Sequence, residues 1–188
     1  MNVYDFDNTI YDGESAFDFF KFFLKKDKKL ITFMPSIIIA FTKYKFGKLS
    51  IEEAMNKYGQ KAVDYYLENP QFRGCISEFW DSHIKNIKPF YETVRKDDDL
   101  ILSCSPEISL KEVCERLNIK SFIGTSIDEE KGKIDRLCLR ENKVKAFFEQ
   151  YPDSQIDDLY TDSFNDKPLM DISKNVYLVK GNKIKKIK

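Results

Sequence analysis

Two carboxylates stand two positions apart near the start of the chain, at Asp5 and Asp7. They fall at the end of a short run, Val3 to Phe6, that is typical of a strand. Side chains two apart in a strand point to the same side, so extended geometry persisting through Asp7 would bring both carboxylates together. Such a pair needs a cation, a shared proton or strong hydrogen bonds. Phosphate chemistry is one interpretation, and an ordinary strand-ending turn is the other.

A second element of possible chemistry is the segment from Leu100 to Glu107. Its apolar start predicts a buried strand ending at Ser103, and Ser105, Pro106 and Glu107 have the order of an N-cap, a first-turn proline and a first-turn acid. The Ser103 hydroxyl and nearby backbone N–H groups would then lie beside a helix N-terminus, which attracts anions. The alternative is that Ser103 only helps to end the strand.

Two further candidates follow along the chain. Lys143 stands near the start of a predicted helix, where a single lysine is usually solvated. Asp162 and Asp166 follow a predicted strand at Leu159 to Thr161, and a helical turn starting at Asp162 would place both carboxylates on one face. The alternative for this pair is an N-cap followed by a surface acid.

The elements that must position these residues alternate between strand and helix. Apolar positions spaced i, i+3, i+4 and i+7 predict helices after the second and third strands. This alternation predicts an α/β fold, a Rossmann-like parallel sheet flanked by helices on both faces. Ligands of such sheets bind beyond the carboxyl ends of the strands, where the candidate residues fall. The predicted strands are Val3–Phe6, Leu100–Ser103, Phe122–Thr125, Leu159–Thr161 and Val176–Val179.

The interval between the first two strands is too long for a simple crossover. It holds 95 residues, whereas a strand-helix-strand unit takes roughly 30 in total. Ser50 with Glu53 predicts a capping box, and Asn69 with Pro70 predicts another helix start. We therefore expect an all-helical cap over residues 13–88, inserted as a lid into an α/β core formed by residues 1–12 and 89–188.

Composition and charge narrow the class of protein. The 188 residues include 31 Lys and Arg and 31 Asp and Glu, so no global bias favours a nucleic-acid partner or an anionic membrane. The four cysteines lack metal-type spacing and no signal peptide precedes Asp5, which predicts a reduced, cytoplasmic protein. The apolar stretch from Leu30 to Phe41 is too short to span a bilayer and contains Pro35, so a buried cap helix without stable membrane insertion is expected.

In this order and spacing, the motifs resemble the haloacid dehalogenase superfamily of phosphatases and phosphotransferases. The resemblance covers nearly the whole chain, and the inserted helices look like the type-one cap of the family. Ser103-x-Ser105-Pro106-Glu107 and Asp162-Ser163-x-x-Asp166-x-Pro168-Leu169 are similar to the branch that includes phosphoserine phosphatase (subfamily IB). One departure is Thr161, which stands where the family often has glycine before a metal-binding Asp, and its side chain could crowd the metal loop.

The resemblance implies a Mg²⁺-dependent phosphomonoester hydrolase with an aspartyl-phosphate intermediate on Asp5. Asp7 would protonate the leaving alcohol and then deprotonate the attacking water. The implied Mg²⁺ site combines the Asp5 carboxylate, the Asp7 backbone carbonyl and Asp162, supported by Asp166. The implied phosphate-binding groups are Ser103, Cys104 and Lys143.

The sequence indicates the identity of the substrate less closely than it indicates the type of reaction. A small phosphorylated metabolite is expected, and Glu14 stands where phosphoserine phosphatases carry a glutamate that receives the substrate amine. A carboxylated substrate should also meet an arginine, and the cap offers only Arg73. Trp80 could face a ligand, although aromatic residues at helical spacing are usually core, and His83 is expected in core packing or partly exposed rather than in catalysis. Lys180 to Lys188 is expected to be a solvated tail.

Three alternative functions stay open on the sequence: a non-catalytic phosphate-binding regulatory module, a phosphotransferase, and a peripheral lipid-phosphate phosphatase. The sequence leaves the oligomeric state open as well.

Overall fold

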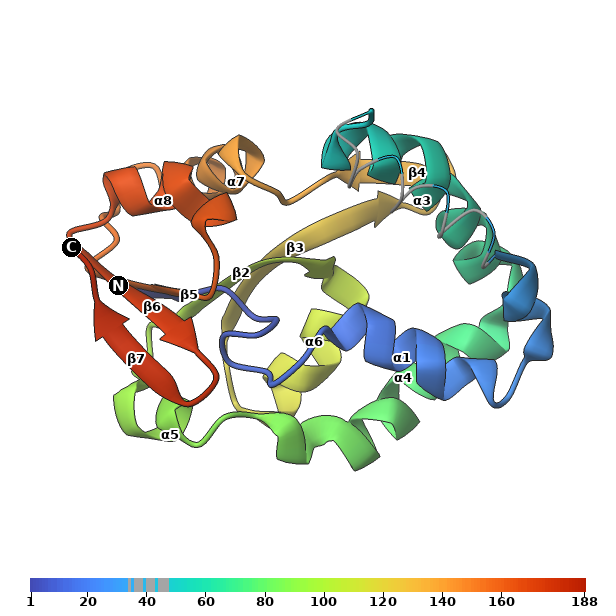
Figure 1. Cartoon of the computed structure of the whole chain (residues 1–188), viewed down its shortest axis with the longest axis horizontal. Helices are drawn as coiled ribbons and strands as arrows, with labels where there is room; N and C mark the ends of the chain where they lie inside the picture. Colours follow the sequence, from blue (N-terminus) through green and yellow to red (C-terminus); the bar gives the residue numbers. More distant parts are fainter. Residues whose placement is uncertain (34, 36–38, 40–42, 44–47) are drawn as a thin grey trace.

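The computed structural model describes residues 1–188 except 34, 36–38, 40–42 and 44–47, and in this part of the chain the strands form one seven-stranded sheet (Figure 1). The strand order is β4-β3-β2-β1-β5-β6-β7. The first strand thus lies in the middle of the sheet. The strands are β1 (Asn2–Tyr4), β2 (Leu100–Pro106), β3 (Ser121–Asp128), β4 (Lys133–Arg136), β5 (Asp158–Thr161), β6 (Asn175–Lys180) and β7 (Lys183–Lys186).

The sheet is parallel in its centre and antiparallel at both edges. Strands β3, β2, β1, β5 and β6 pair in parallel, which confirms the predicted α/β core. The two outer strands, β4 and β7, pair antiparallel with their neighbours and were not predicted. Residues 183–186 are exposed, as expected, but they do not form a free tail, because Gly181, at a φ of 56°, turns the chain back so that Lys183 pairs with Lys180.

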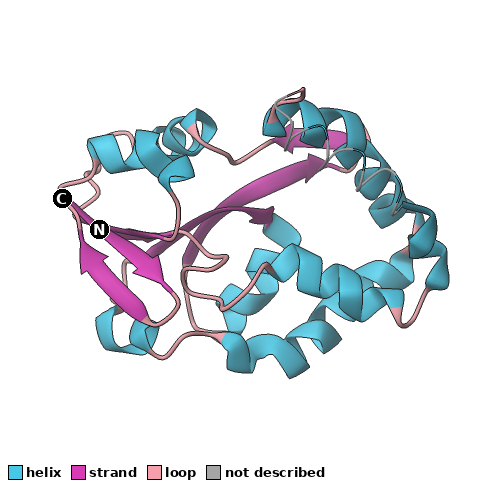
Figure 2. Ribbon diagram, viewed as in Figure 1, coloured by secondary structure: helices cyan, strands magenta, loops and turns pink. Residues whose placement is uncertain are grey.

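Helices cover both faces of the sheet. In Figures 1 and 2, α7 (Glu141–Gln150) and α8 (Lys167–Ile172) lie on one side, and α5 (Phe90–Val94) and α6 (Glu107–Arg116) lie on the other. Neighbouring strand residues contribute to different cores. Val3, Leu100 and Leu102 pack in one apolar cluster, while Tyr4 and Ile101 pack in the other. This alternation is the two-residue period of a strand buried on both faces.

Among the described residues, the chain between β1 and β2 is helical wherever it forms regular structure, apart from isolated bridges at Asp7, Tyr11 and Ile87. It contains α1 (Ser15–Leu24), α3 (Ile51–Glu68) and α4 (Pro70–His83), with short 3-10 segments at Lys28–Phe33 and Ile84–Asn86. The predicted capping box is present, since the Ser50 hydroxyl accepts from the Glu53 N–H (3.0 Å) and the Ser50 N–H donates to the Glu53 carboxylate (2.7 Å). Asn69 caps α4, and Pro70 is its first residue, as predicted.

Part of the apolar stretch from Leu30 to Phe41 lies outside the described residues, so the expectation of a buried cap helix there stays a prediction. No helix within the described part of the chain combines the length and the apolar character that crossing a membrane requires.

The two ends of the inserted segment run side by side. The Asp12 N–H donates to the Asn86 carbonyl (2.8 Å), and the Lys88 N–H donates to the Ile10 carbonyl (2.7 Å). Tyr11 and Ile87 form an antiparallel bridge between these two bonds. The chain therefore leaves the core and returns to it through one two-stranded ribbon.

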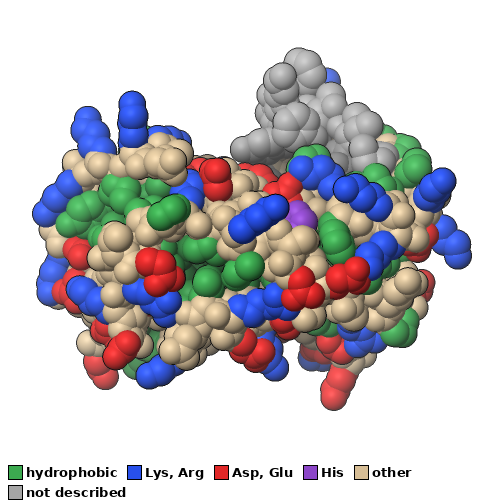
Figure 3. Space-filling model, turned by 90° about the horizontal axis from the view of Figure 1, so that it is seen from below, with side chains coloured by type: hydrophobic (Ala, Val, Ile, Leu, Met, Phe, Trp, Pro, Cys, Tyr) green, Lys and Arg blue, Asp and Glu red, His purple; other side chains and the backbone are tan. Residues whose placement is uncertain are grey.

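Charged side chains of both signs are interspersed over the face shown in Figure 3. This mixture agrees with the equal numbers of acidic and basic residues in the sequence.

Candidate active site

The loop after β1 carries the first two candidate carboxylates. Asp5 directly follows the strand, and its N–H donates to the Tyr160 carbonyl of β5 (2.9 Å). The extended geometry does not persist to Asp7, because the Phe6 carbonyl accepts from the N–H groups of Ile10 and Tyr11 (2.9 Å each) in a tight turn. The strand pleat therefore does not orient the two aspartates.

Hydrogen bonds from two distant segments orient Asp7 instead. Its Oδ1 accepts from the Ser15 N–H at the start of α1 (2.7 Å), and its Oδ2 accepts from the Ser105 hydroxyl of β2 (2.5 Å). The Ser15 and Ser105 hydroxyl oxygens are 3.2 Å apart. Asp7 thus joins its own loop to the first inserted helix and to β2.

The segment from Ser103 to Glu107 differs from its predicted form. Strand β2 continues to Pro106, which is the N-cap of α6, so the prediction of Ser105 as N-cap is wrong. Ser105 stays extended because β2 pairs with β3 as far as Pro106 and Thr125, and its hydroxyl donates to Asp7. Ser103 is buried, and its hydroxyl accepts from the Ser105 N–H (3.1 Å).

Cys104 lies between these serines and is half-buried. Its carbonyl accepts from the Thr125 hydroxyl (2.6 Å), which ties this segment to β3. Burial raises the pKa of the Cys104 thiol to about 11, against the opposing effect of the Lys143 ammonium. The phosphate-binding roles of Ser103 and Cys104 stay predictions.

Lys143 lies between two of the predicted carboxylates. It is buried on α7, and its Nζ is 2.9 Å from Asp5 Oδ1 and 2.8 Å from Asp166 Oδ1. Asp166 also accepts from the Thr161 hydroxyl (2.8 Å). The structure thus brings Asp5, Lys143 and Asp166 into one buried network at the carboxyl ends of β1 and β5.

The charged groups in this network shift one another's pKa values. Burial lowers the pKa of Lys143, but the carboxylates of Asp5 and Asp166 outweigh that effect and hold its pKa above the ordinary value. Burial raises the pKa of Asp5, and Lys143 opposes this shift. A further cation beside Asp5 would favour its ionised form.

Asp162 lies half-buried at the carboxyl end of β5. Burial raises its pKa, which the Lys180 ammonium partly offsets. Its backbone carbonyl accepts from the Lys180 ammonium (2.5 Å). Among the described residues, Oδ2 of Asp5 accepts no hydrogen bond, because Lys143 donates to Oδ1.

Carboxylate oxygens such as those of Asp5 and Asp162 suit a hard cation such as Mg²⁺. No group of three or more His, Cys, Asp and Glu side chains in the described chain has the arrangement of a metal cluster. The predicted set has only two direct carboxylates, Asp5 and Asp162, with a backbone carbonyl from Asp7. The donor chemistry therefore fits the predicted ion, with Asp166 held by Lys143 and Thr161.

Thr161 does not crowd this loop. Its buried side chain turns toward Asp166, and its hydroxyl also accepts from the Ser163 N–H (3.3 Å). Lys88 is a buried residue that the sequence interpretation missed. Its ammonium donates to the Asn8 carbonyl in the loop that carries Asp7.

The remaining candidates lie outside this network. Glu14 is exposed and accepts from the Asn8 side-chain amide (2.6 Å), so a role in binding a substrate amine stays a prediction. Arg73 stacks on Tyr66 and pairs with Glu129 (3.5 Å). Trp80 is fully buried, and His83 stacks on Phe79, which agrees with their expected roles in packing.

Comparisons with known proteins agree with this architecture. The family model described as haloacid dehalogenase-like hydrolase matches residues 3–171. A protein of unknown function from Bordetella pertussis Tohama I is structurally similar, with a TM-score of 0.75 and 14% identity over 94% of this chain and 87% of that chain. No curated protein matches the sequence.

Two more solved structures share the fold. A phosphoserine phosphohydrolase-like protein from Francisella tularensis subsp. tularensis SCHU S4 has a TM-score of 0.58 and 18% identity over 94% of this chain and 86% of that chain. A HAD family hydrolase from Salmonella enterica subsp. enterica serovar Typhi has a TM-score of 0.58 and 11% identity over 92% of this chain and 59% of that chain. At these identities, the likeness shows the fold alone.

Proposed function

The chain belongs to the haloacid dehalogenase-like hydrolase family, and we propose that it is a Mg²⁺-dependent phosphatase that acts on a small phosphorylated metabolite. The observation that carries the proposal is the position of the buried Lys143 ammonium between Asp5 and Asp166. A nucleophilic carboxylate that attacks a phosphate dianion needs positive charge beside it, and Lys143 supplies one such charge.

In this proposal Asp5 is the nucleophile. Its Oδ2, which accepts no hydrogen bond from the described residues, would attack phosphorus while Lys143 holds Oδ1 (2.9 Å). The bond from phosphorus to the ester oxygen breaks, and the alcohol leaves with a proton from Asp7. A water molecule then attacks the aspartyl-phosphate, gives its proton to Asp7 and releases inorganic phosphate.

Ser105 gives Asp7 a partner in both protonation states. A hydroxyl can donate to an ionised carboxylate and can rotate to accept from a protonated one. The bond between Ser105 and Asp7 (2.5 Å) therefore suits a group that cycles one proton. The Ser15 N–H holds the other oxygen of Asp7 throughout.

The Asp5 and Asp162 carboxylates and the Asp7 carbonyl would hold Mg²⁺, with Asp166 in support. When bound, the ion supplies positive charge against the nucleophile and the phosphate oxygens. Ser103, Cys104 and neighbouring N–H groups would bind the remaining phosphate oxygens near the start of α6. We also propose residues 1–12 and 89–188 as the catalytic core, residues 13–88 as a cap and the cytoplasm as its location.

The test is release of inorganic phosphate from p-nitrophenyl phosphate by protein stripped with EDTA and then supplied with Mg²⁺. We expect turnover to require Mg²⁺ and Asp5→Asn to lower it by about three orders of magnitude or more, because the nucleophile is lost. Asp153→Asn, at an exposed position, is the matched control and should keep wild-type activity. Near-normal activity of Asp5→Asn at unchanged circular dichroism would contradict the nucleophile assignment.

A further inference from the structure

A pocket of about 240 Å³ lies between the inserted helices and the core. Two of the residues that line it, Ala16 and Pro106, directly follow Ser15 and Ser105, the two residues whose groups hold the Asp7 carboxylate. Consecutive Cα atoms are about 3.8 Å apart. Two positions of the pocket wall are therefore one residue along the chain from the groups that hold Asp7, the residue that protonates the leaving alcohol in the proposed reaction.

The lining of this pocket is almost entirely apolar. No Lys, Arg, Asp or Glu is among the described residues that line it, and its walls include Phe19, Phe20 and Ile134. The polar side chains in it are largely engaged elsewhere. The Thr125 hydroxyl donates to the Cys104 carbonyl (2.6 Å), and the Tyr66 hydroxyl donates to Glu129 (2.8 Å). A leaving group with several hydroxyls would lose its hydrogen bonds to water here and find few replacements.

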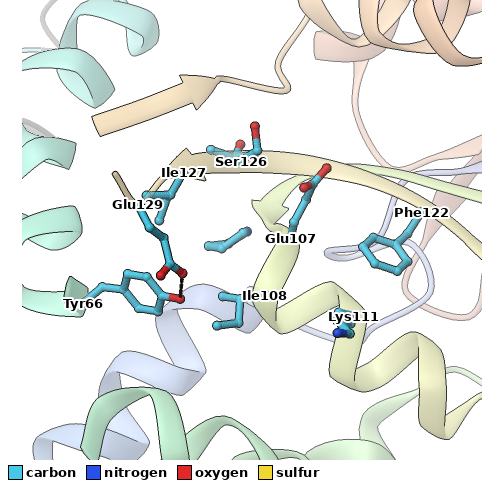
Figure 4. A pocket seen from close by; sticks show the side chains of 10 residues that line it. Tyr66, Glu107, Ile108, Lys111, Phe122, Ser126, Ile127 and Glu129 are labelled. Carbon is cyan, nitrogen blue, oxygen red and sulfur yellow. Dashed lines mark hydrogen bonds between the residues drawn. The ribbon is translucent and has the colours of Figure 1, made fainter. Parts of the chain in front are cut away.

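A second pocket of about 350 Å³ continues from the first. The two share Tyr66, Ile108 and Ile127 among their lining residues. Figure 4 shows Tyr66 reaching Glu129 on one side, with Ile127 on β3 and Ile108 on α6. Charged side chains enter the lining only in this second pocket, at Glu107, Lys111 and Glu129. The first pocket is therefore the apolar part of a longer depression.

The only arginine of the inserted segment already interacts with other groups of the protein. Arg73 stacks on Tyr66, pairs with Glu129 and donates to the Leu67 carbonyl, and it lines neither pocket. A substrate carboxylate in the apolar pocket would meet no cation from the described lining. The charge of such a substrate would have to be desolvated without compensation.

We propose that the alcohol released by this enzyme is apolar, so that the substrate is a phosphomonoester with an alkyl or aryl leaving group that binds in the pocket lined by Ala16, Ala62, Pro106 and Ile134. This inference rests on the proposed phosphatase function and narrows its substrate class. It excludes phosphoserine and sugar phosphates as preferred substrates, because their leaving groups carry charge or several hydroxyls.

The first test is a series of linear alkyl phosphates from ethyl to octyl, kept below the concentration at which they form micelles. We expect kcat/KM to rise by about two- to fourfold for each added methylene and then level off when the pocket is full. Phosphoserine and glycerol phosphate should fall at least roughly tenfold below the butyl or hexyl ester. A flat series, or phosphoserine as the best substrate, overturns the inference while the phosphatase function stands.

A pocket-filling variant checks where the chain binds. Ala62→Trp places a large ring in the pocket from an exposed position of α3, and Glu68→Trp on the same helix is the control outside the lining. Ala62→Trp should flatten the chain-length series, whereas Glu68→Trp should leave its slope unchanged. An equal slope in all three proteins, with circular dichroism unchanged, contradicts this location for the leaving group.

Binding without turnover separates the two proposals. Alkyl phosphonates cannot be hydrolysed, and calorimetry in Mg²⁺ should give a Kd that falls with chain length in wild type and in Asp5→Asn. Chain-dependent binding without phosphate release from any ester would support the apolar pocket and contradict the phosphatase function. Binding that is independent of chain length would contradict the pocket.

One more experiment distinguishes a lipid from a soluble ester as the source of the apolar alcohol. Vesicles of phosphatidylcholine containing phosphatidate present the same phosphate on a lipid. Hydrolysis of both dispersed and vesicle-bound esters supports the inference with a lipid source, and hydrolysis of the dispersed esters alone supports it with a soluble source. Hydrolysis confined to polar esters overturns it.

Discussion

Lys143 is the residue on which the buried charges of the site depend. It lies on α7 with 3% of its surface exposed, and its ammonium contacts Asp5 and Asp166. A buried ion pair contributes little net stability compared with an apolar pair, but loss of one partner leaves an uncompensated charge. Because the Lys143 ammonium pairs with two carboxylates, its removal leaves two buried charges without a partner.

We therefore predict that Lys143→Met lowers the free energy of unfolding by about 3–5 kcal/mol at pH 7 without metal. It should also abolish phosphate release, because Asp5 would lose the cation that holds it. Urea unfolding in EDTA measures the first effect. Lys145→Met, at an exposed position two residues along α7, is the control and should change stability by less than about 0.5 kcal/mol. Equal effects of the two variants would contradict the assigned role of Lys143.

The sequence indicates well which charged residues come into contact. It indicates less well which hydrogen-bond partners orient them. Asp5, Lys143 and Asp166 are predicted together from the order of their motifs, and the structure brings them into contact. Ser15 and Ser105 were missed as partners of Asp7, because bonds between positions 7 and 105 depend on how β1 and β2 lie in the sheet. The sequence Ser105-Pro106-Glu107 also fits a helix cap, which hides its tertiary role.

At the scale of elements, β3 approaches the junction of β2 and α6 closely at Gly124. A Cβ atom at this position would lie 2.6 Å from the Ser105 carbonyl oxygen and 2.7 Å from Leu110 Cδ1. The Gly124 N–H also donates to Glu107 (3.1 Å). Glycine is needed here for space, and this space sets the distance between β3 and the segment that holds Asp7.

Gly124→Ala is accordingly predicted to destabilise the protein by about 1–3 kcal/mol, because the Ser105 backbone must shift. The shift should also lower kcat, since Ser105 positions Asp7. Gly74→Ala in α4 is a matched control whose Cβ meets nothing within 4 Å, and it should stabilise the protein by roughly 0.5–1 kcal/mol. Thermal unfolding and phosphate release measure both variants. A tolerated Gly124→Ala would show that this close approach is unimportant.

Elements with buried faces were predicted well, and elements at edges were not. The five parallel strands contain apolar runs, such as Leu100 to Leu102, that indicate burial. Strand β7 consists of Lys183, Ile184, Lys185 and Lys186, all exposed, so its composition resembles a solvated tail. Only pairing with β6 makes it a strand, and backbone pairing leaves little trace in side-chain type. Strand β4 was missed for the same reason.

At the scale of the whole molecule, charge is balanced. The equal numbers of acidic and basic side chains leave little net repulsion near neutral pH. The pH dependence of stability should then follow particular buried groups. Asp99 is one of them, because it is 3% exposed and burial raises the pKa of its carboxyl to about 6. One of its oxygens accepts from the Lys96 N–H (2.8 Å).

A raised pKa means that the folded protein binds the Asp99 proton more tightly than the unfolded chain does. Its contribution to stability is therefore greatest below the unfolded pKa, near 4, and is lost as the pH rises through about 6. We predict that Asp99→Asn removes a fall in unfolding free energy on the order of 1–3 kcal/mol between these pH values. Urea unfolding from pH 4 to 7 checks this, with the exposed Asp97→Asn as control. An unchanged pH profile would contradict the role of Asp99.

The ribbon that joins residues 10–12 to residues 86–88 has a consequence for how this architecture can change over evolution. Its two backbones are already hydrogen-bonded, and paired strands lie only about 4.8 Å apart. A turn of a few residues would close that gap, so the sheet needs nothing from the intervening sequence to complete its connectivity. Insertions, deletions or wholesale replacement between these positions would leave the strand register intact. Substrate preference can thus diverge by exchange of a module, provided that the new segment still supplies the backbone N–H that Ser15 donates to Asp7.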